Sequence, residues 1–270
     1  MIKTIILFII LFMACLKVEC QDLALSFKEN AIKLEKNDSL NKSVYNLLSP
    51  YRLIMIGEIH GTNEPVNFLV ELVKLLTYYG DSVQIGFEIP TMEMQPFLKQ
   101  KNKINLLETD FFKYPTGDGR ASEAWYNAIS RISNMPKASL FFFDINSTEI
   151  GNVDSIMYHN VKSKIKERPN LKTITICGGI HNSLKMYDNQ NTMGVLLYND
   201  KELSINDSIC SINHNFKGGQ TLWNKFNEME TVYSKIEYDN YLYIYPKNSK
   251  EPYSGFLYTK FVTKSDSVIK

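Results

Sequence analysis

The stretch that decides the fold is Leu53–His60, which reads Leu-Ile-Met-Ile-Gly-Glu-Ile-His. Its four consecutive apolar residues, with no polar residue between them, indicate a strand that is buried on both faces. The apolar run stops at Gly57, and the ionisable residues Glu58 and His60 follow at once. A glycine at the end of a strand permits a sharp turn. We therefore expect both ionisable side chains to lie over the end of a buried strand.

Short apolar runs of this kind alternate with helical stretches through the middle of the chain. Further buried strands are expected at 83–87, 140–145 and 173–177, and amphipathic helices at 65–79, 121–133 and 154–168. The alternation predicts an α/β fold with a mainly parallel central sheet and helices on both faces.

The two ends of the chain follow a different pattern. Residues 21–50 are polar and predict a helical outer layer. After residue 193 short strands separated by turns are expected at 193–198, 209–212 and 241–245. These extra C-terminal strands would either extend the same sheet or form a small cap.

Ionisable residues stand where each predicted strand of the parallel sheet stops. In open parallel sheets, ligands bind beyond the carboxyl ends of the strands. Any single acid there is more often a helix N-cap, but four successive strand ends with such residues favour a functional site. The residues delivered to this edge are Glu58 and His60, Glu88, Asp144, and His181.

Two of the four histidines, His60 and His181, each close a Gly-x-x-His turn. A neutral histidine beside a carboxylate is a competent general base at neutral pH. Histidine is also a common ligand of divalent metals, and the spacing alone does not choose between the two roles. His159, in a predicted helix, and His214, in a predicted polar loop, are interpreted as structural or solvated.

A glycine-rich loop ending in Arg120 precedes the helix predicted at 121–133. The loop reads Gly117-Asp118-Gly119-Arg120, and its glycines allow it to fold tightly. Arg120 is therefore expected to reach the carboxyl edge, where a guanidinium could hold a carboxylate or stabilise an oxyanion. The alternative is a surface loop with a solvated arginine.

The first twenty residues are predicted to be a signal peptide. Lys3 precedes a ten-residue apolar run at 5–14, which is too short to span a bilayer and has the length of a signal-peptide core. Cleavage after Cys20 and lipidation of Cys15 in a loose lipobox are both open. The protein is thus expected to be exported to the periplasm, the cell envelope or the medium, with membrane attachment if Cys15 is lipidated. Residues 21–270 are expected to form a single domain.

The amino-acid composition limits the kinds of partner that the protein is expected to bind. The chain has 30 basic and 29 acidic residues, a balance that gives no electrostatic reason to expect nucleic acid. A small molecule or a peptide is the expected substrate. Outside the leader only Cys177 and Cys210 remain. Because Cys177 lies inside an apolar run, we expect a buried free thiol and no disulfide.

Five blocks of the chain, in the same order, resemble the erythromycin esterase family. They cover roughly residues 50–200, so the match exceeds a single motif. The wider superfamily includes ChaN-like haem-binding lipoproteins and the TraB/Tiki proteins. The blocks are Gly57–Glu64, Gly86–Glu88, Asp154–Val161 (which resembles an Asp-x-x-Met-x-x-Asn helix), Thr175–Asn182 and Met193–Leu197.

The resemblance implies an α/β fold with its site at the carboxyl edge, and a hydrolase acting on an ester or amide bond. By position, it assigns Glu58 and His60 as the water-activating pair and Glu88 as a supporting carboxylate. Arg120 becomes a charge-stabilising group and His181 the second site histidine. Contacts with the substrate are expected from Glu64, Asp144 and Asn182.

The chain also departs from the family pattern. Val153 stands where the family usually has Arg, and Gly178-Gly179 gives a Tiki-like spacing before the second histidine. The region covering the substrate is expected to be reduced to about residues 91–118, so a substrate other than a macrolide is expected.

The resemblance leaves the cofactor open between none and a divalent metal. The esterases are regarded as metal-free, whereas the Tiki proteins are regarded as metal-dependent. A Tiki-like hydrolase or peptidase would use His60, His181 and Glu58 as candidate ligands. A ChaN-like haem-binding lipoprotein is the third alternative, although the Cys-x-x-Cys-His attachment motif is absent.

Overall fold

The computed structural model describes residues 29–35, 40–100, 105–115, 117–222, 224–228, 238–247 and 249–268. The predicted signal peptide, with Cys15 and Cys20, lies outside this range. Within it, no helix has both the length and the apolar character needed to cross a membrane.

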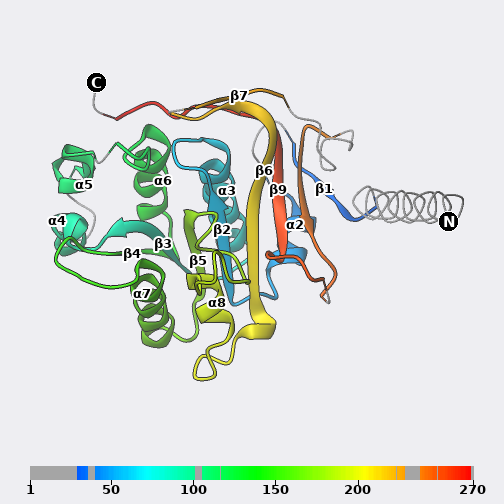
Figure 1. Cartoon of the computed structure of the whole chain (residues 1–270), viewed down its shortest axis with the longest axis horizontal. Coiled ribbons are helices and arrows are strands. Elements are labelled where there is room, and N and C mark those ends of the chain that lie inside the picture. Colours follow the sequence, from blue (N-terminus) through cyan, green and yellow to red (C-terminus); the bar gives the residue numbers. More distant parts are fainter. Residues whose placement is uncertain are drawn as a thin grey trace, which may run out of the picture.

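The described residues form one sheet of nine strands (Figure 1). Its order is β1-β8-β9-β6-β2-β5-β3-β4, and β7 pairs with β6. The run from β9 to β4 is parallel throughout, whereas β1, β7 and β8 pair antiparallel. The strands are β1 (Ile32–Lys33), β2 (Leu53–Glu58), β3 (Val83–Pro90), β4 (Ala138–Asp144), β5 (Lys172–Gly178), β6 (Ile209–Gln220), β7 (Lys225–Phe226), β8 (Asn240–Ile244) and β9 (Gly255–Val262).

Helices cover both faces of the parallel part, as predicted. Short 3₁₀ turns lie at Met92–Met94, Leu106–Glu108 and Asn206–Ser208. The described helices from α2 onward are α2 (Lys42–Leu48), α3 (Glu64–Tyr78), α4 (Gln95–Lys99), α5 (Asp110–Lys113), α6 (Glu123–Ser133), α7 (Val153–Glu167) and α8 (Met193–Tyr198).

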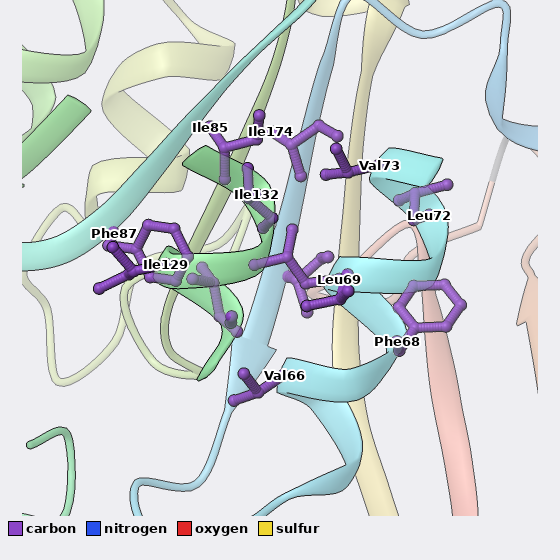
Figure 2. Close-up of a cluster of buried hydrophobic side chains, with 14 of the residues drawn as sticks. Val66, Phe68, Leu69, Leu72, Val73, Ile85, Phe87, Ile129, Ile132 and Ile174 are labelled. Atoms are coloured by element: carbon purple, nitrogen blue, oxygen red, sulfur yellow. The ribbon is translucent and has the colours of Figure 1, made fainter. Parts of the chain in front are cut away.

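Alternate side chains of each central strand enter different cores, which is the reason β2 has no polar residue before Glu58. Ile54 and Ile56 pack in the core under α3 and α6. Figure 2 shows side chains of this core from both helices and from the strands, among them Leu69, Ile129 and Ile174. Leu53 and Met55 pack on the opposite face in the core under α7 and α8. Strands buried on both faces are therefore largely apolar, with Gln84 on β3 and Thr173 and Thr175 on β5 as buried polar exceptions.

The C-terminal strands extend the same sheet and form no separate cap. β6 is parallel to β2 and β9 is parallel to β6, so the sheet continues beyond β2. Cys177 and Cys210 are both buried and free, which confirms the prediction of no disulfide between them.

Two predicted elements are wrong. Residues 193–198 form helix α8 and not a strand, because Thr192 caps the helix by accepting a hydrogen bond from Val195 N at 3.1 Å. A short apolar run does not by itself distinguish a strand from a buried helix. Within 21–50, Lys42–Leu48 is helical, but Ile32–Lys33 is a strand because it pairs with the edge of β8.

The strand order places the predicted site residues side by side. β5 lies between β2 and β3, and β4 follows β3. Glu58 is paired with Gly178 in register, and Pro90 with Asp144. The carboxyl ends of these four parallel strands therefore meet at one edge of the sheet.

Candidate active site

Each of the two turn histidines forms a pair with a carboxylate. Nδ1 of His60 lies 2.5 Å from Oε1 of Glu58, and Nδ1 of His181 lies 2.9 Å from Oδ1 of Asp154. The imidazole side chains are 26% and 24% exposed, so both rings are partly accessible to solvent. A carboxylate that accepts from Nδ1 leaves Nε2 of the neutral ring as a proton acceptor.

The turn after β2 explains how His60 returns over the strand end. Gly61 has φ +80°, a conformation that favours glycine. The hydroxyl of Thr62 donates to the carbonyl of Ile59 at 2.8 Å and closes the turn. Glu58 is fully buried, and its Oε2 has no hydrogen-bond partner within the described part of the chain. Within the described residues, its side-chain hydrogen bond is therefore the one to His60.

The Nε2 atoms of both rings face Glu88. His60 Nε2 lies 4.0 Å from Oε2 of Glu88, and His181 Nε2 lies 3.9 Å from Oε1. A methyl group on Gly178 would lie 3.6 Å from Cε1 of His60 and 3.5 Å from Cδ2 of His181. The rings therefore flank this glycine, whose N–H donates to Glu88 Oε2 at 2.6 Å. Gly178 therefore lies between the two rings, and its N–H holds the carboxylate that both Nε2 atoms face.

Arg120 lies among three carboxyl groups. Its Nε and Nη2 donate to Oδ2 of Asp118 at 2.9 and 2.7 Å. Its Nη1 donates to Asp144 at 2.6 Å and to the backbone carbonyl of Glu88 at 2.8 Å, and lies 3.2 Å from Oε1 of Glu88. These four bonds use most of the five N–H groups of a guanidinium. Arg120 therefore organises carboxylates and has little capacity left for an oxyanion.

The cluster shifts the pKa values of its members. Burial lowers the pKa of His60, but the hydrogen bond and charge of Glu58 and the charge of Glu88 outweigh it, so the net pKa lies above the usual 6.5. The pKa of His181 is raised in the same way, against burial, by Asp154, Glu88 and Asp144. Burial raises the pKa of Glu88 although Arg120 and both histidines oppose it.

The structure brings most of the predicted site residues together. Glu58, His60, Glu88, Arg120, Asp144 and His181 form one contiguous cluster. Asn182 lies beneath it, fully buried, with its Oδ1 2.9 Å from the thiol of Cys177. Glu64 is directed elsewhere, because its Oε1 accepts from the backbone N–H of Thr263 at 2.8 Å.

Two cluster members were absent from the sequence-based site. Asp154 is the first residue of the Asp-x-x-Met-x-x-Asn block, and its place in that block could have identified it as a site residue. Asp118 stands in the glycine-rich loop, two residues before Arg120, where its side chain also accepts from the backbone N–H of Arg120 at 2.9 Å. Hydrogen bonding to Arg120, against the effect of burial, lowers the pKa of Asp118.

The remaining histidines lie outside the cluster. His159 is exposed on α7. His214 is in strand β6 and not in a loop as predicted; its Nε2 lies 2.8 Å from the hydroxyl of Thr259, and burial lowers its pKa to about 3. Its role is structural.

The residues do not fit the predicted metal ligand set. Glu58 contacts Nδ1 of His60, on the opposite side of the ring from the Nε2 that faces Glu88. Arg120 also places a positive charge 3.2 Å from Glu88. Among the described residues, no three His, Cys, Asp or Glu side chains are grouped as metal ligands. Glu58 therefore lies apart from the place where the Nε2 atoms of His60 and His181 face Glu88.

Several solved structures share the fold, three of which follow. A Bacillus cereus protein superposes with a TM-score of 0.72 at 10% identity, over 92% of this chain and 99% of that one. A succinoglycan biosynthesis protein gives 0.71 at 10% identity, over 91% and 98%. A mutant of the erythromycin esterase EreC in its open conformation gives 0.59 at 10% identity, over 85% and 95%.

No family model matches the chain, and no curated protein matches it in sequence. The structural likeness nevertheless confirms, at the level of the fold, the resemblance to erythromycin esterase-like proteins. The chain is an α/β protein of this fold, with two histidine–carboxylate pairs at the carboxyl edge of its sheet.

Proposed function

We propose that the protein is a hydrolase in which His60 activates water for attack on an ester or amide carbonyl. The observation that carries the proposal is the geometry of His60. Its Nδ1 is 2.5 Å from the buried Glu58, and its Nε2, at the other edge of a side chain that is 26% exposed, faces Glu88 across 4.0 Å. Water at that edge would be within reach of a nitrogen base and a carboxylate at once.

The reaction would proceed in two steps. Nε2 of His60 takes a proton from water while the water oxygen bonds to the carbonyl carbon, and the carbonyl electron pair moves to oxygen. Protonated His181, on the other side of Gly178, stabilises the resulting oxyanion. Collapse restores the carbonyl, breaks the bond to the leaving group, and returns the proton from His60 to that group.

The charge of the cluster favours a substrate without negative charge. Even with both imidazoles protonated, three cationic groups face five carboxyl groups. An excess of one charge at a site attracts ligands of the opposite sign and repels those of its own. The acidic residues counted are Glu58, Glu88, Asp118, Asp144 and Asp154.

A panel of three activated esters tests the proposal. The purified protein is expected to hydrolyse the neutral p-nitrophenyl acetate and the cationic acetylthiocholine. Mono-p-nitrophenyl succinate, which carries a carboxylate, is expected to have a kcat/KM roughly tenfold lower than the neutral ester at low ionic strength. Added salt should narrow this difference, because screening weakens the repulsion. No turnover of any ester would overturn the hydrolase, and equal turnover of all three would overturn the charge argument.

A further inference from the structure

Asp154 occupies the first turn of α7, yet it does not cap this helix. The cap is Asn152, whose Oδ1 accepts from Ser155 N at 3.0 Å. An acid in a first turn is usually explained by the helix dipole. Here, Asp154 Oδ1 instead accepts from Nδ1 of His181 at 2.9 Å and from the backbone N–H of Met193 at 2.7 Å. The carboxylate thus links three segments: the turn after β5, the start of α7 and the start of α8.

The backbone of His181 is fixed by the same junction. Its carbonyl accepts from Gly194 N at 2.8 Å, and its N–H donates to the carbonyl of Gly178 at 3.0 Å. A methyl group on Gly194 would come within 2.4 Å of the Ser183 carbonyl, so α8 packs directly on this turn. With the backbone held in this way, the bond to Asp154 fixes the rotation of the ring.

We propose that Asp154 is the positioning residue of His181, holding Nδ1 protonated and Nε2 toward Glu88 so that His181 is the cationic group of the site. The inference deepens the proposed hydrolase and rests on it for its catalytic consequence. Each histidine is then held at Nδ1 by one carboxylate, but the two rings have different roles. His60 accepts the proton of water, and His181 donates Nε2–H to the developing oxyanion.

The charged groups around His181 set the sign of the expected pH effect. Glu88 on β3, Asp144 on β4 and Asp154 on α7 all favour the imidazolium, whereas burial opposes it. Activity that needs a charged His181 falls as the pH rises through its pKa. Asp154→Asn keeps an acceptor for both N–H groups but removes one negative charge, so the loss of activity should occur at a lower pH.

Histidine NMR titration and kinetics of the full chain test the inference. In Asp154→Asn, the titration midpoint of His181 is expected to fall by roughly one pH unit while that of His60 stays in place. The alkaline limb of kcat for p-nitrophenyl acetate should move by the same amount, and kcat should drop roughly 100-fold with little change in KM. Asn152→Ala is the matched control: it removes the cap of the same helix turn and is expected to leave both titrations unchanged.

Each alternative outcome is distinguishable. An unchanged His181 midpoint in Asp154→Asn, or an equal shift in Asn152→Ala, overturns the positioning role. If Asp154→Asn does not fold, ¹⁵N spectra of the unaltered protein decide the question. Neutral His181 should be the Nδ1–H tautomer, and the Nε2–H tautomer overturns the inference. If the titrations are as expected but the protein has no esterase activity, the proposed hydrolase function is rejected and the positioning role of Asp154 is retained.

Discussion

Replacing Arg120 with methionine is expected to lower the free energy of unfolding by about 3–5 kcal/mol, because it leaves buried carboxylates without their counter-charge. The Arg120 side chain is 14% exposed and contacts Glu88, Asp118 and Asp144 within 3.2 Å. Methionine preserves much of the apolar volume but offers no donor. Removing one partner of a buried ion pair destabilises the fold by far more than the intact pair stabilises it, because the remaining charge is left desolvated.

Arg131→Met is the matched control for chemical denaturation. Arg131 pairs with Glu71 at 3.2 Å, but its side chain is 48% exposed. The expected loss there is below about 1 kcal/mol, as for other surface ion pairs. Adding Asp144→Asn to Arg120→Met removes one of the uncompensated charges and should recover part of the lost stability. Equal losses for the two arginine variants would contradict the buried-cluster interpretation.

His60→Asn is expected to lower kcat for p-nitrophenyl acetate by roughly 100- to 10,000-fold, the range that a general base contributes. Asparagine is of similar size and can still hydrogen-bond to Glu58, so the fold should be retained. It cannot take a proton from water at neutral pH. KM should change little, because the ring acts on water and not on the bound ester.

His159→Asn supplies the control on the same chain. His159 is exposed on α7 and lies outside the cluster, so its replacement should leave kcat unchanged. Thermal unfolding of both variants would check that neither has lost its structure. An unchanged kcat in a folded His60→Asn variant would remove His60 from the mechanism.

The strand ends were predictable because a parallel sheet has a simple physical signature. Runs such as 53–56 and 173–177, the second with threonine as its only polar residue type, are buried on both faces, and the first ionisable residue after each run marks the carboxyl edge. His60, Glu88 and His181 were found in this way. The strand order was not predictable, because local pattern does not say that β5 lies between β2 and β3.

The sequence pattern also did not reveal which side chains far apart in the sequence contact each other. Asp154 is 27 positions from His181, and a first-turn acid has an ordinary helical explanation. Glu64, by contrast, lies only four residues after His60, yet it bonds to Thr263 at the far end of the chain. A position at a strand end is therefore a better predictor that a residue belongs to the site than closeness in sequence to a motif.

The pH dependence of kcat/KM for p-nitrophenyl acetate, in the unaltered protein and in Glu58→Gln, tests the central claim most directly. His60 acts as a base only when neutral, so activity should be lost as the pH falls through its pKa, which lies above the usual 6.5. Removing the charge of Glu58 lets burial lower that pKa, and the acidic limb should move to lower pH with a reduced plateau. An acidic limb at the same pH in both proteins would contradict a His60 base supported by Glu58.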